Sequence, residues 1–132
     1  MKIKEIMRPA RTISETATVK EAAKMMNKHR IGSVIAIDEN KKKVTGILTE
    51  RDVLEKVTAL NKLASKVKVM NIMTKKVITI GPDALIDDAV YLLIQHKIKK
   101  LPVVENHELL GIITSTDLIT NSGEIGQFYV FD

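Results

Sequence analysis

Apolar residues recur along this chain at two spacings, and each spacing predicts one type of element. A return every three or four positions is typical of a helix with one buried face, whereas a run of β-branched residues between polar turns is typical of a strand. The first helical pattern begins after a capping box at Thr18 and Glu21 and runs to about His29. The second has acidic residues at its start and carries the stripe Ile86, Ala89, Val90, Leu93 and Ile94. We expect one face of each helix to be buried.

Each predicted helix is followed by two β-branched runs with a polar turn between them, which is the pattern of a β-hairpin. The paired runs are 33–37 with 44–48 and 101–104 with 109–113. Shorter extended segments before the helices are 11–13 and 77–80. Apolar residues from Val53 to Leu60 predict a further helix after Asp52. The predicted unit is therefore strand, helix, strand, strand, helix.

This unit occurs twice, because single residues also repeat in order along the chain. Met7 is matched by Met73, His29 by His96 and Asp52 by Asp117, at separations of 66, 67 and 65 residues. Such an ordered match indicates an internal duplication. We expect an α/β (α+β) fold of two repeats, residues 1–64 and residues 65–132, with 61–71 as the link. Units of about 65 residues are marginal alone, so the repeats are expected to share a core.

Composition limits the classes of protein that this chain can represent. The 132 residues include no cysteine and three histidines in separate segments, so a disulfide, a thiol nucleophile or a metal site is not expected. No apolar run approaches the roughly 18 residues that span a bilayer, and the first residues do not resemble a secretion signal. We expect a cytoplasmic protein without a membrane partner.

The net charge is moderately positive, with 21 basic and 16 acidic residues. Lysines spread over a solvated surface are the preferred explanation of this excess, and an anionic partner is the alternative. Aromatic residues make up 3% of the chain and tryptophan is absent, which leaves no obvious platform for stacking bases. Nucleic-acid binding therefore rests on charge alone.

The junction between the last strand and the last helix of each unit carries the most informative motif. Both copies read glycine, two aliphatic residues, threonine, two variable residues and aspartate, from Gly46 to Asp52 and from Gly111 to Asp117. Threonine followed three residues later by a carboxylate is a helix-capping arrangement that needs no ligand. The same geometry points backbone N–H groups and a carboxylate outward, which suits a phosphate beside a sugar. Both interpretations stay open.

The duplicated unit, the similar residues after His29 and His96, and the two Gly-x-x-Thr-x-x-Asp endings resemble cystathionine β-synthase (CBS) domains. The resemblance covers about residues 3–121. It implies two repeats packed about a pseudo-twofold axis, forming a Bateman module. It also implies two clefts that bind AMP, ADP, ATP or S-adenosylmethionine as a regulatory ligand, with no other cofactor.

The resemblance also implies which residues form each cleft. One aspartate in each cleft would accept hydrogen bonds from the sugar hydroxyls. The first cleft would consist of Asp117 and Thr114 with Thr12, Ile13, Ile31, Gly32 and Ser33. The second would consist of Asp52 and Thr49 with Val77, Ile78, Ile98, Lys99, Lys100 and Leu101. Four corner residues would be phosphate candidates: His29, Arg30, His96 and Lys97.

Two differences between the copies make the clefts unequal. Pro102 of the second copy is replaced by Ile35 in the first, and Gly32 with Ser33 of the first is replaced by Lys99 with Lys100 in the second. Lysines that turn inward would favour more phosphate charge in the Asp52 cleft, whereas lysines in solvent would leave that cleft empty. At the corners, a histidine that caps a helix C-terminus is the alternative to a phosphate contact.

These observations favour a regulatory sensor rather than an enzyme, because no nucleophile and base pair is visible. Such a sensor needs a separate effector protein or a second copy, and the resemblance implies a homodimer formed through helices. An interaction scaffold without a ligand is the alternative, and a nucleic-acid binder is a weaker one. The apolar residues 128–131 are expected to pack on this molecule or on a second one.

Overall fold

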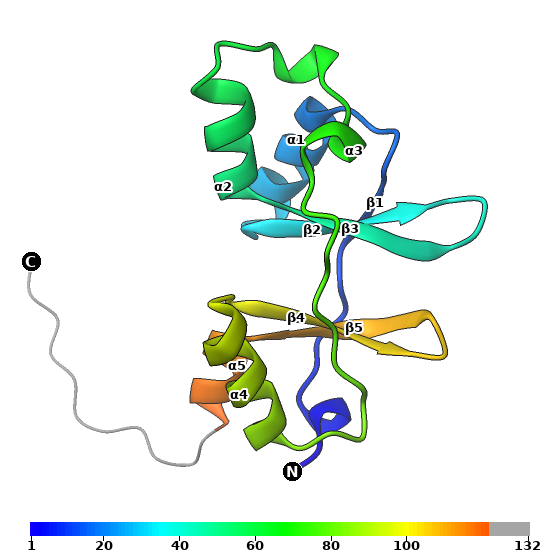
Figure 1. The fold of residues 1–132 in the computed structure, drawn as a ribbon, viewed down its shortest axis with the longest axis vertical. Coiled ribbons are helices and arrows are strands. Elements are labelled where there is room, and N and C mark those ends of the chain that lie inside the picture. Colours follow the sequence, from blue (N-terminus) through cyan, green and yellow to red (C-terminus); the bar gives the residue numbers. More distant parts are fainter. Residues whose placement is uncertain (122–132) are drawn as a thin grey trace, which may run out of the picture.

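The computed structural model describes residues 1–121, in which two β-sheets lie near the middle and the helices lie outside them (Figure 1). In the first repeat, β1 runs parallel to β2, and β2 pairs antiparallel with β3. The elements of this repeat are β1 (Thr12–Ser14), α1 (Val19–His29), β2 (Ser33–Asp38), β3 (Lys43–Thr49) and α2 (Glu50–Val53), which continues as a π-helical segment, η2 (Leu54–Thr58). The predicted fold class is therefore confirmed.

The second repeat has the same hairpin and helices but a smaller sheet. Its elements are α4 (Ile86–His96), β4 (Lys100–Glu105), β5 (Glu108–Thr114) and α5 (Ser115–Thr120). The extended segment predicted at 77–80 forms a single parallel bridge, between Ile80 and Val103. The rest of the segment forms no strand, and Val77 and Ile78 line a cavity.

The predicted helical stripes are buried to different degrees. Helix α1 buries Val19, Ala22 and Met26. Helix α4 buries Ala89 and Leu93, but the side chain of Ile94 is 73% exposed. One face of α4 is therefore buried as expected, but the buried part of the stripe is limited to Ala89 and Leu93, which pack toward β4 and α5.

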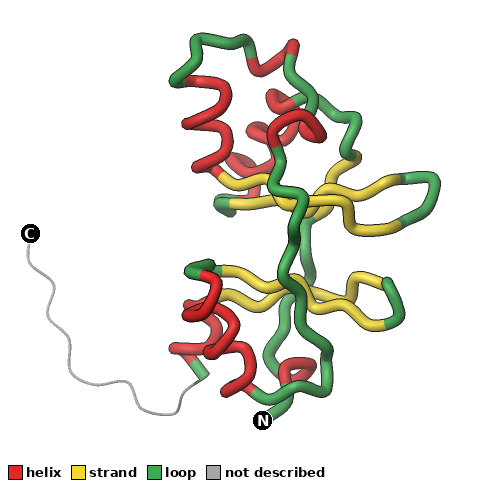
Figure 2. Tube along the Cα trace, viewed as in Figure 1, coloured by secondary structure: helices red, strands yellow, loops and turns green. Residues whose placement is uncertain are grey.

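Two hydrophobic cores form in place of the single shared core that was expected, because each sheet packs against the helices of its own repeat (Figure 2). Each core is completed by a segment from the start of the other repeat. Ile3 is fully buried in the core of the second repeat, and Val69 of α3 (Val69–Ile72) is fully buried in the core of the first. We call the segments that carry Ile3 and Val69 the exchanged segments. The first begins with a 3-10 turn, η1 (Ile3–Glu5), and the second follows a 3-10 turn, η3 (Ala64–Lys66). The repeats are thus interlocked.

Each exchanged segment crosses a strand of the opposite repeat beside the glycine of the repeated motif, and this contact explains why glycine occupies the position in both copies. Arg8 forms backbone hydrogen bonds of 3.0 and 2.8 Å with Ile112, and Thr74 forms the equivalent pair with Ile47. A methyl group on Gly111 would lie 2.7 Å from the Arg8 carbonyl oxygen, and one on Gly46 would lie 2.9 Å from the Thr74 carbonyl oxygen. Only glycine lets the exchanged segment approach the strand this closely.

No helix within residues 1–121 is long and apolar enough to cross a membrane. The apolar residues 128–131 lie outside the described residues.

Candidate functional site

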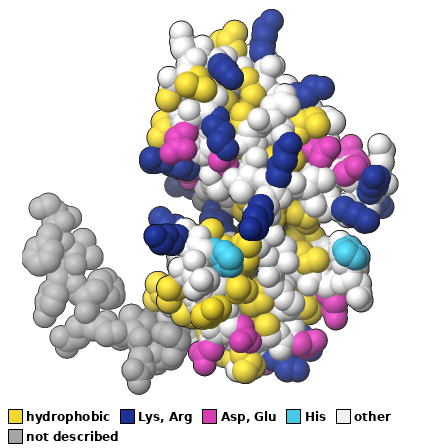
Figure 3. All heavy atoms as spheres, in the orientation of Figure 1, with side chains coloured by type: hydrophobic (Ala, Val, Ile, Leu, Met, Phe, Trp, Pro, Cys, Tyr) yellow, Lys and Arg dark blue, Asp and Glu magenta, His cyan; other side chains and the backbone are white. Residues whose placement is uncertain are grey.

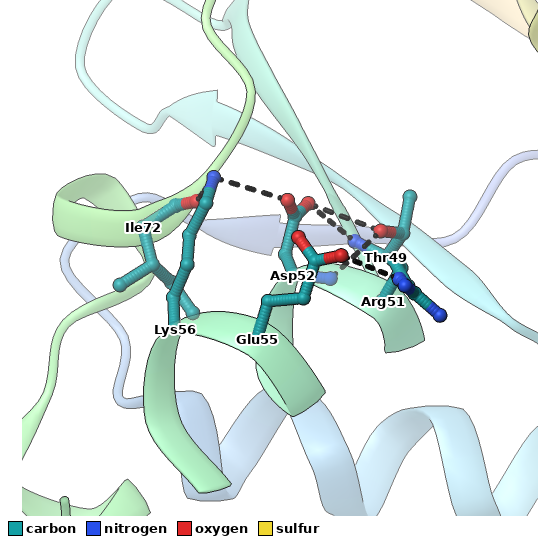
Figure 4. A network of polar contacts seen from close by, with 6 residues as sticks. All are labelled: Thr49, Arg51, Asp52, Glu55, Lys56 and Ile72. Carbon is teal, nitrogen blue, oxygen red and sulfur yellow. Dashed lines mark hydrogen bonds and ion pairs between the residues drawn. The ribbon is translucent and has the colours of Figure 1, made fainter. Parts of the chain in front are cut away.

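The first Gly-x-x-Thr-x-x-Asp motif forms a capping box at the start of α2 (Figure 4). The Asp52 backbone N–H donates to Thr49 Oγ1 (3.1 Å), and the Thr49 backbone N–H donates to Asp52 Oδ2 (3.0 Å). The second carboxylate oxygen, Oδ1, lies 3.1 Å from Lys56 Nζ, which also donates to the Ile72 carbonyl oxygen (2.8 Å). The buried Asp52 carboxylate therefore has partners for both oxygens.

The second motif forms the same box at the start of α5 but uses a different cation. Asp117 Oδ2 accepts from the Thr114 backbone N–H (3.0 Å) and hydroxyl (2.9 Å). Asp117 Oδ1 lies 2.7 Å from Nε of Arg8, which belongs to the segment at the start of the first repeat. The helix-capping interpretation of both motifs is thus observed directly.

A cavity of about 600 Å³ opens between the two repeats on the Thr49 side. Its walls are aliphatic where Ile47 of β3 faces Val77, Ile78 and Ile98 of the second repeat. Its charged lining consists of Glu50, Arg51, Lys76, Lys97, Lys99 and Lys100. Five cations line this cavity against one carboxylate, and a second carboxylate, Glu55, pairs with Arg51, so the lining has a net positive charge. Figure 3 shows Lys and Arg side chains at the seam between the two halves as well as over the upper half. We call this cavity the large cavity.

The structure brings most residues of the predicted second cleft to the large cavity. Thr49, Val77, Ile78, Ile98, Lys99 and Lys100 line it. Leu101 does not, because its side chain is fully buried in the core of the second repeat. Asp52 does not line it either, because its carboxylate is held by the capping box and by Lys56.

A second cavity, of about 150 Å³, lies on the Asp117 side, and we call it the small cavity. Four residues of the predicted first cleft line it: Ile31, Ser33, Thr114 and Asp117. Thr12 and Ile13 lie instead in β1, where Ile13 belongs to the core of the first repeat, and Gly32 lines the large cavity. Arg8, Arg11 and Lys100 supply the positive charge of the small cavity.

Lys100 connects the two cavities. Its Nζ donates to Ser33 Oγ over 3.0 Å, from the start of β4 to the start of β2. Burial lowers the pKa of Lys100, the Glu50 carboxylate opposes this shift, and the charge of Lys99 adds to it. The sequence left open whether Lys100 turns inward or faces solvent. This contact shows that it turns inward, because its ammonium lies between the two repeats.

The four corner residues divide between the cavities and the surface. Lys97 lines the large cavity, whereas His29, Arg30 and His96 line neither cavity. Arg30 and Lys97 adopt the left-handed conformation, with φ of 52° and 53°, and end α1 and α4. Desolvation, followed by the charges of Arg11 and Lys28, lowers the pKa of His29.

Two side chains that pair with the motif aspartates, Arg8 and Lys56, were not identified from the sequence. A comparison of equivalent positions contains the signal, since Arg8 corresponds to Thr74 and Lys56 corresponds to Asn121. Each buried aspartate has one cationic partner, but Lys56 comes from the same repeat as Asp52, whereas Arg8 comes from the opposite repeat to Asp117. Glu50, Arg51 and Lys76 of the large cavity were also missed, because Glu50 and Arg51 occupy the variable positions of the motif and Lys76 precedes the extended segment 77–80.

Comparisons with known proteins agree with this geometry. The CBS domain family model matches the chain twice, at residues 3–59 and 69–124. The chain therefore belongs to the CBS domain family, and it is a CBS domain pair, a type of regulatory module.

Individual relatives differ in how much of their length the chain spans. An uncharacterized protein of Methanopyrus kandleri is 38% identical over 82% of this chain, which spans 55% of that protein. The CBS domain-containing protein YhcV of Bacillus subtilis is 32% identical over 83% of this chain and 76% of its own length. Among solved structures, the hexameric CBS-CP12 protein from bloom-forming cyanobacteria is 30% identical with a TM-score of 0.83, over 93% of this chain and 72% of that one.

Proposed function

We propose that this CBS pair is a non-catalytic sensor whose large cavity binds an anionic adenosine ligand, AMP, ADP or ATP. The observation that carries the proposal is the open cavity of about 600 Å³ lined by both repeats, with aliphatic residues for a base and five cationic side chains for phosphates, of which Arg51 is paired with Glu55. Binding sites for small molecules commonly have volumes of about 300 to 1,000 Å³ and combine apolar walls with a few polar groups. The large cavity meets both conditions.

The charge of the cavity discriminates between the adenosine ligands implied by the family. Five cations and one carboxylate attract phosphates, whereas the sulfonium of S-adenosylmethionine is itself positive. We therefore infer that affinity rises from adenosine to AMP to ATP and that S-adenosylmethionine binds more weakly than ATP. The small cavity, at about 150 Å³, is below the size of a nucleotide site in this conformation.

The two aspartates remain proposed sugar ligands. Oδ1 of each carboxylate has one cationic partner, Lys56 for Asp52 and Arg8 for Asp117, and keeps a lone pair for a sugar hydroxyl. Asp117 already lines the small cavity, whereas Asp52 would have to turn toward the large cavity. The Thr49 hydroxyl and the Glu50 carboxylate are already at the large cavity.

A non-catalytic role is supported by the chemistry of the linings. Among the described residues, the lining of the two cavities includes neither histidine nor cysteine. The Ser33 hydroxyl does lie beside an amine, but Lys100 donates to it and so acts there as a hydrogen-bond donor and not as a base. A sensor transmits binding to a partner, and we propose a separate effector protein as the recipient of the signal.

We also propose self-association through the apolar side of α4. Tyr91 and Ile94 are 64% and 73% exposed on one helix, and the CBS-CP12 neighbour is hexameric. Burial of such residues against a second copy would remove apolar area from water. Light scattering tests this proposal: the native chain should form a dimer, and Ile94→Lys should be monomeric. A monomeric native chain at 100 μM would contradict it.

Thermal unfolding with AMP, ADP, ATP and S-adenosylmethionine tests the proposed ligand class. A ligand at about 100 times its dissociation constant adds about 2.7 kcal/mol, which raises Tm by about 10 °C in a domain of this size. The matched variants are Lys76→Ala, which removes one charge from the large cavity, and Lys41→Ala, which removes one from the exposed turn of the first hairpin. ATP should stabilise the native chain and Lys41→Ala alike and stabilise Lys76→Ala less. A flat response of the native chain at millimolar concentrations would leave the interaction scaffold as the better explanation.

A further inference from the structure

Lys100 and Ser33 occupy equivalent positions in the two repeats. Ser33 begins β2 and pairs with Thr49, and Lys100 begins β4 and pairs with Thr114, the two capping threonines. The hydrogen bond between Lys100 Nζ and Ser33 Oγ therefore joins two symmetry-related positions across the pseudo-twofold axis. This pair is one of the positions at which the two repeats differ in charge.

Among the described residues, Lys100 is the one residue that lines both cavities. Its hydrogen-bond partner, Ser33, lines the small cavity. Its ammonium also approaches the floor of the large cavity, because a methyl group on Gly32 would lie 3.3 Å from Lys100 Nζ and 2.6 Å from Glu50 Oε1. A single ammonium thus lies where it can serve either cavity.

The Glu50 carboxylate acts on the charge of Lys100, but from beyond ion-pair distance. Within residues 1–121 its hydrogen-bond partner is a neutral hydroxyl, and it forms no ion pair. An ammonium has three donors, so at least two are available to another acceptor. Burial lowers the pKa of Lys100, which is the behaviour of a cation that would gain from a nearby anion.

We propose that Lys100 is a shared anion ligand, which rests on Ser33 at the small cavity and turns to the phosphates of a ligand bound in the large cavity. An anion in the large cavity then removes positive charge from the small one, so two anions bind the module with negative coupling. Ser33 competes with the ligand for the same ammonium. This inference rests on the proposed function for the adenosine part of the ligand, but the role of Lys100 requires only an anion.

Calorimetric titration of the full chain with inorganic tripolyphosphate, and separately with ATP, tests this competition. Lys100→Ala should weaken tripolyphosphate binding about tenfold, because a charge-assisted hydrogen bond is lost. Ser33→Ala should instead strengthen it about threefold, because the lysine no longer has to leave a partner. Lys41→Ala removes the same charge from an exposed turn and should change affinity less than about twofold.

The opposite signs of the two variants separate this role from a structural one. If the hydrogen bond merely supports the fold, Lys100→Ala and Ser33→Ala weaken binding together, and the proposal is overturned. Should Lys100→Ala fail to fold, as its melting curve would show, the direction of the Ser33→Ala effect still decides. Lys100-dependent binding of tripolyphosphate without binding of ATP would sustain the shared lysine and reject the adenosine sensor. A native chain that binds neither anion would reject both.

Discussion

Arg8 Nε lies 2.7 Å from Asp117 Oδ1, so a residue near the start of the chain pairs with the capping aspartate of the last described helix. The Asp117 side chain is 4% exposed, whereas that of Arg8 is 67% exposed. The contact therefore joins a buried acceptor to a hydrated cation. Its two members should contribute unequally to stability.

We predict that Asp117→Ala lowers the free energy of unfolding by about 1 to 2 kcal/mol, since it removes the acceptor of the capping box. Arg8→Ala should cost less than about 1 kcal/mol, because an exposed cation gains little from pairing. Urea unfolding of both variants measures the difference. An Arg8→Ala variant as unstable as Asp117→Ala would contradict this assignment.

At the other aspartate the cation should matter more. Lys56 Nζ holds both Asp52 Oδ1 and the Ile72 carbonyl oxygen, so it connects α2 to the exchanged segment α3. We predict that Lys56→Ala destabilises the chain by about 1 to 3 kcal/mol, since two acceptors lose their donor. Lys62→Ala is the matched control, because Lys62 is exposed. Equal melting temperatures for the two variants would argue against this role.

The crossings of the exchanged segments predict a difference between two glycines. Gly111→Ala should destabilise the chain by about 1 to 3 kcal/mol, because the new methyl would lie 2.7 Å from the Arg8 carbonyl oxygen. Gly81→Ala places its methyl in open space and should leave stability within about 0.5 kcal/mol of the native value. The two unfolding curves, recorded side by side, check the interlocked arrangement. Identical curves would show that the segment does not pack on β5.

The lowered pKa of His29 predicts how stability depends on pH. Because its pKa falls below the ordinary value of 6.5 on folding, the unfolded chain binds more protons between the two values. His29 should therefore make the chain less stable as pH falls through the region just below 6.5, and His29→Gln should lack this contribution. In an NMR titration, Arg11→Ala should raise the pKa of His29, since one nearby positive charge is removed. An unchanged His29 titration in that variant would contradict the contribution of Arg11, which adds to the larger effect of desolvation.

Local patterns were sufficient to predict most of the fold. The helix ending at His29 and the hairpins that meet Thr49 and Thr114 depend on apolar spacing and capping residues that are close in sequence. The exchange of Ile3 and Val69 between the cores was not predictable in this way, because it depends on which sheet a distant segment reaches.

The candidate site was predictable where the two copies agree and not where they differ. Thr49 and Thr114 are equivalent residues of the two copies, and each lines one cavity. Asp52 was expected beside its threonine in the lining, but Lys56, which has no counterpart at Asn121, holds it outside. A cation four residues along a helix competes for a carboxylate in a way that a motif does not record.

The central claim is that both repeats together bind one anionic adenosine ligand in the large cavity. Backbone amide NMR shifts during titration with ATP test it most directly. Gly32 and Thr49 of the first repeat and Ile78 and Lys99 of the second should shift together, with one dissociation constant. Shifts confined to one repeat or to the exposed turn at 41–43, or no shifts at millimolar ATP, would contradict the account.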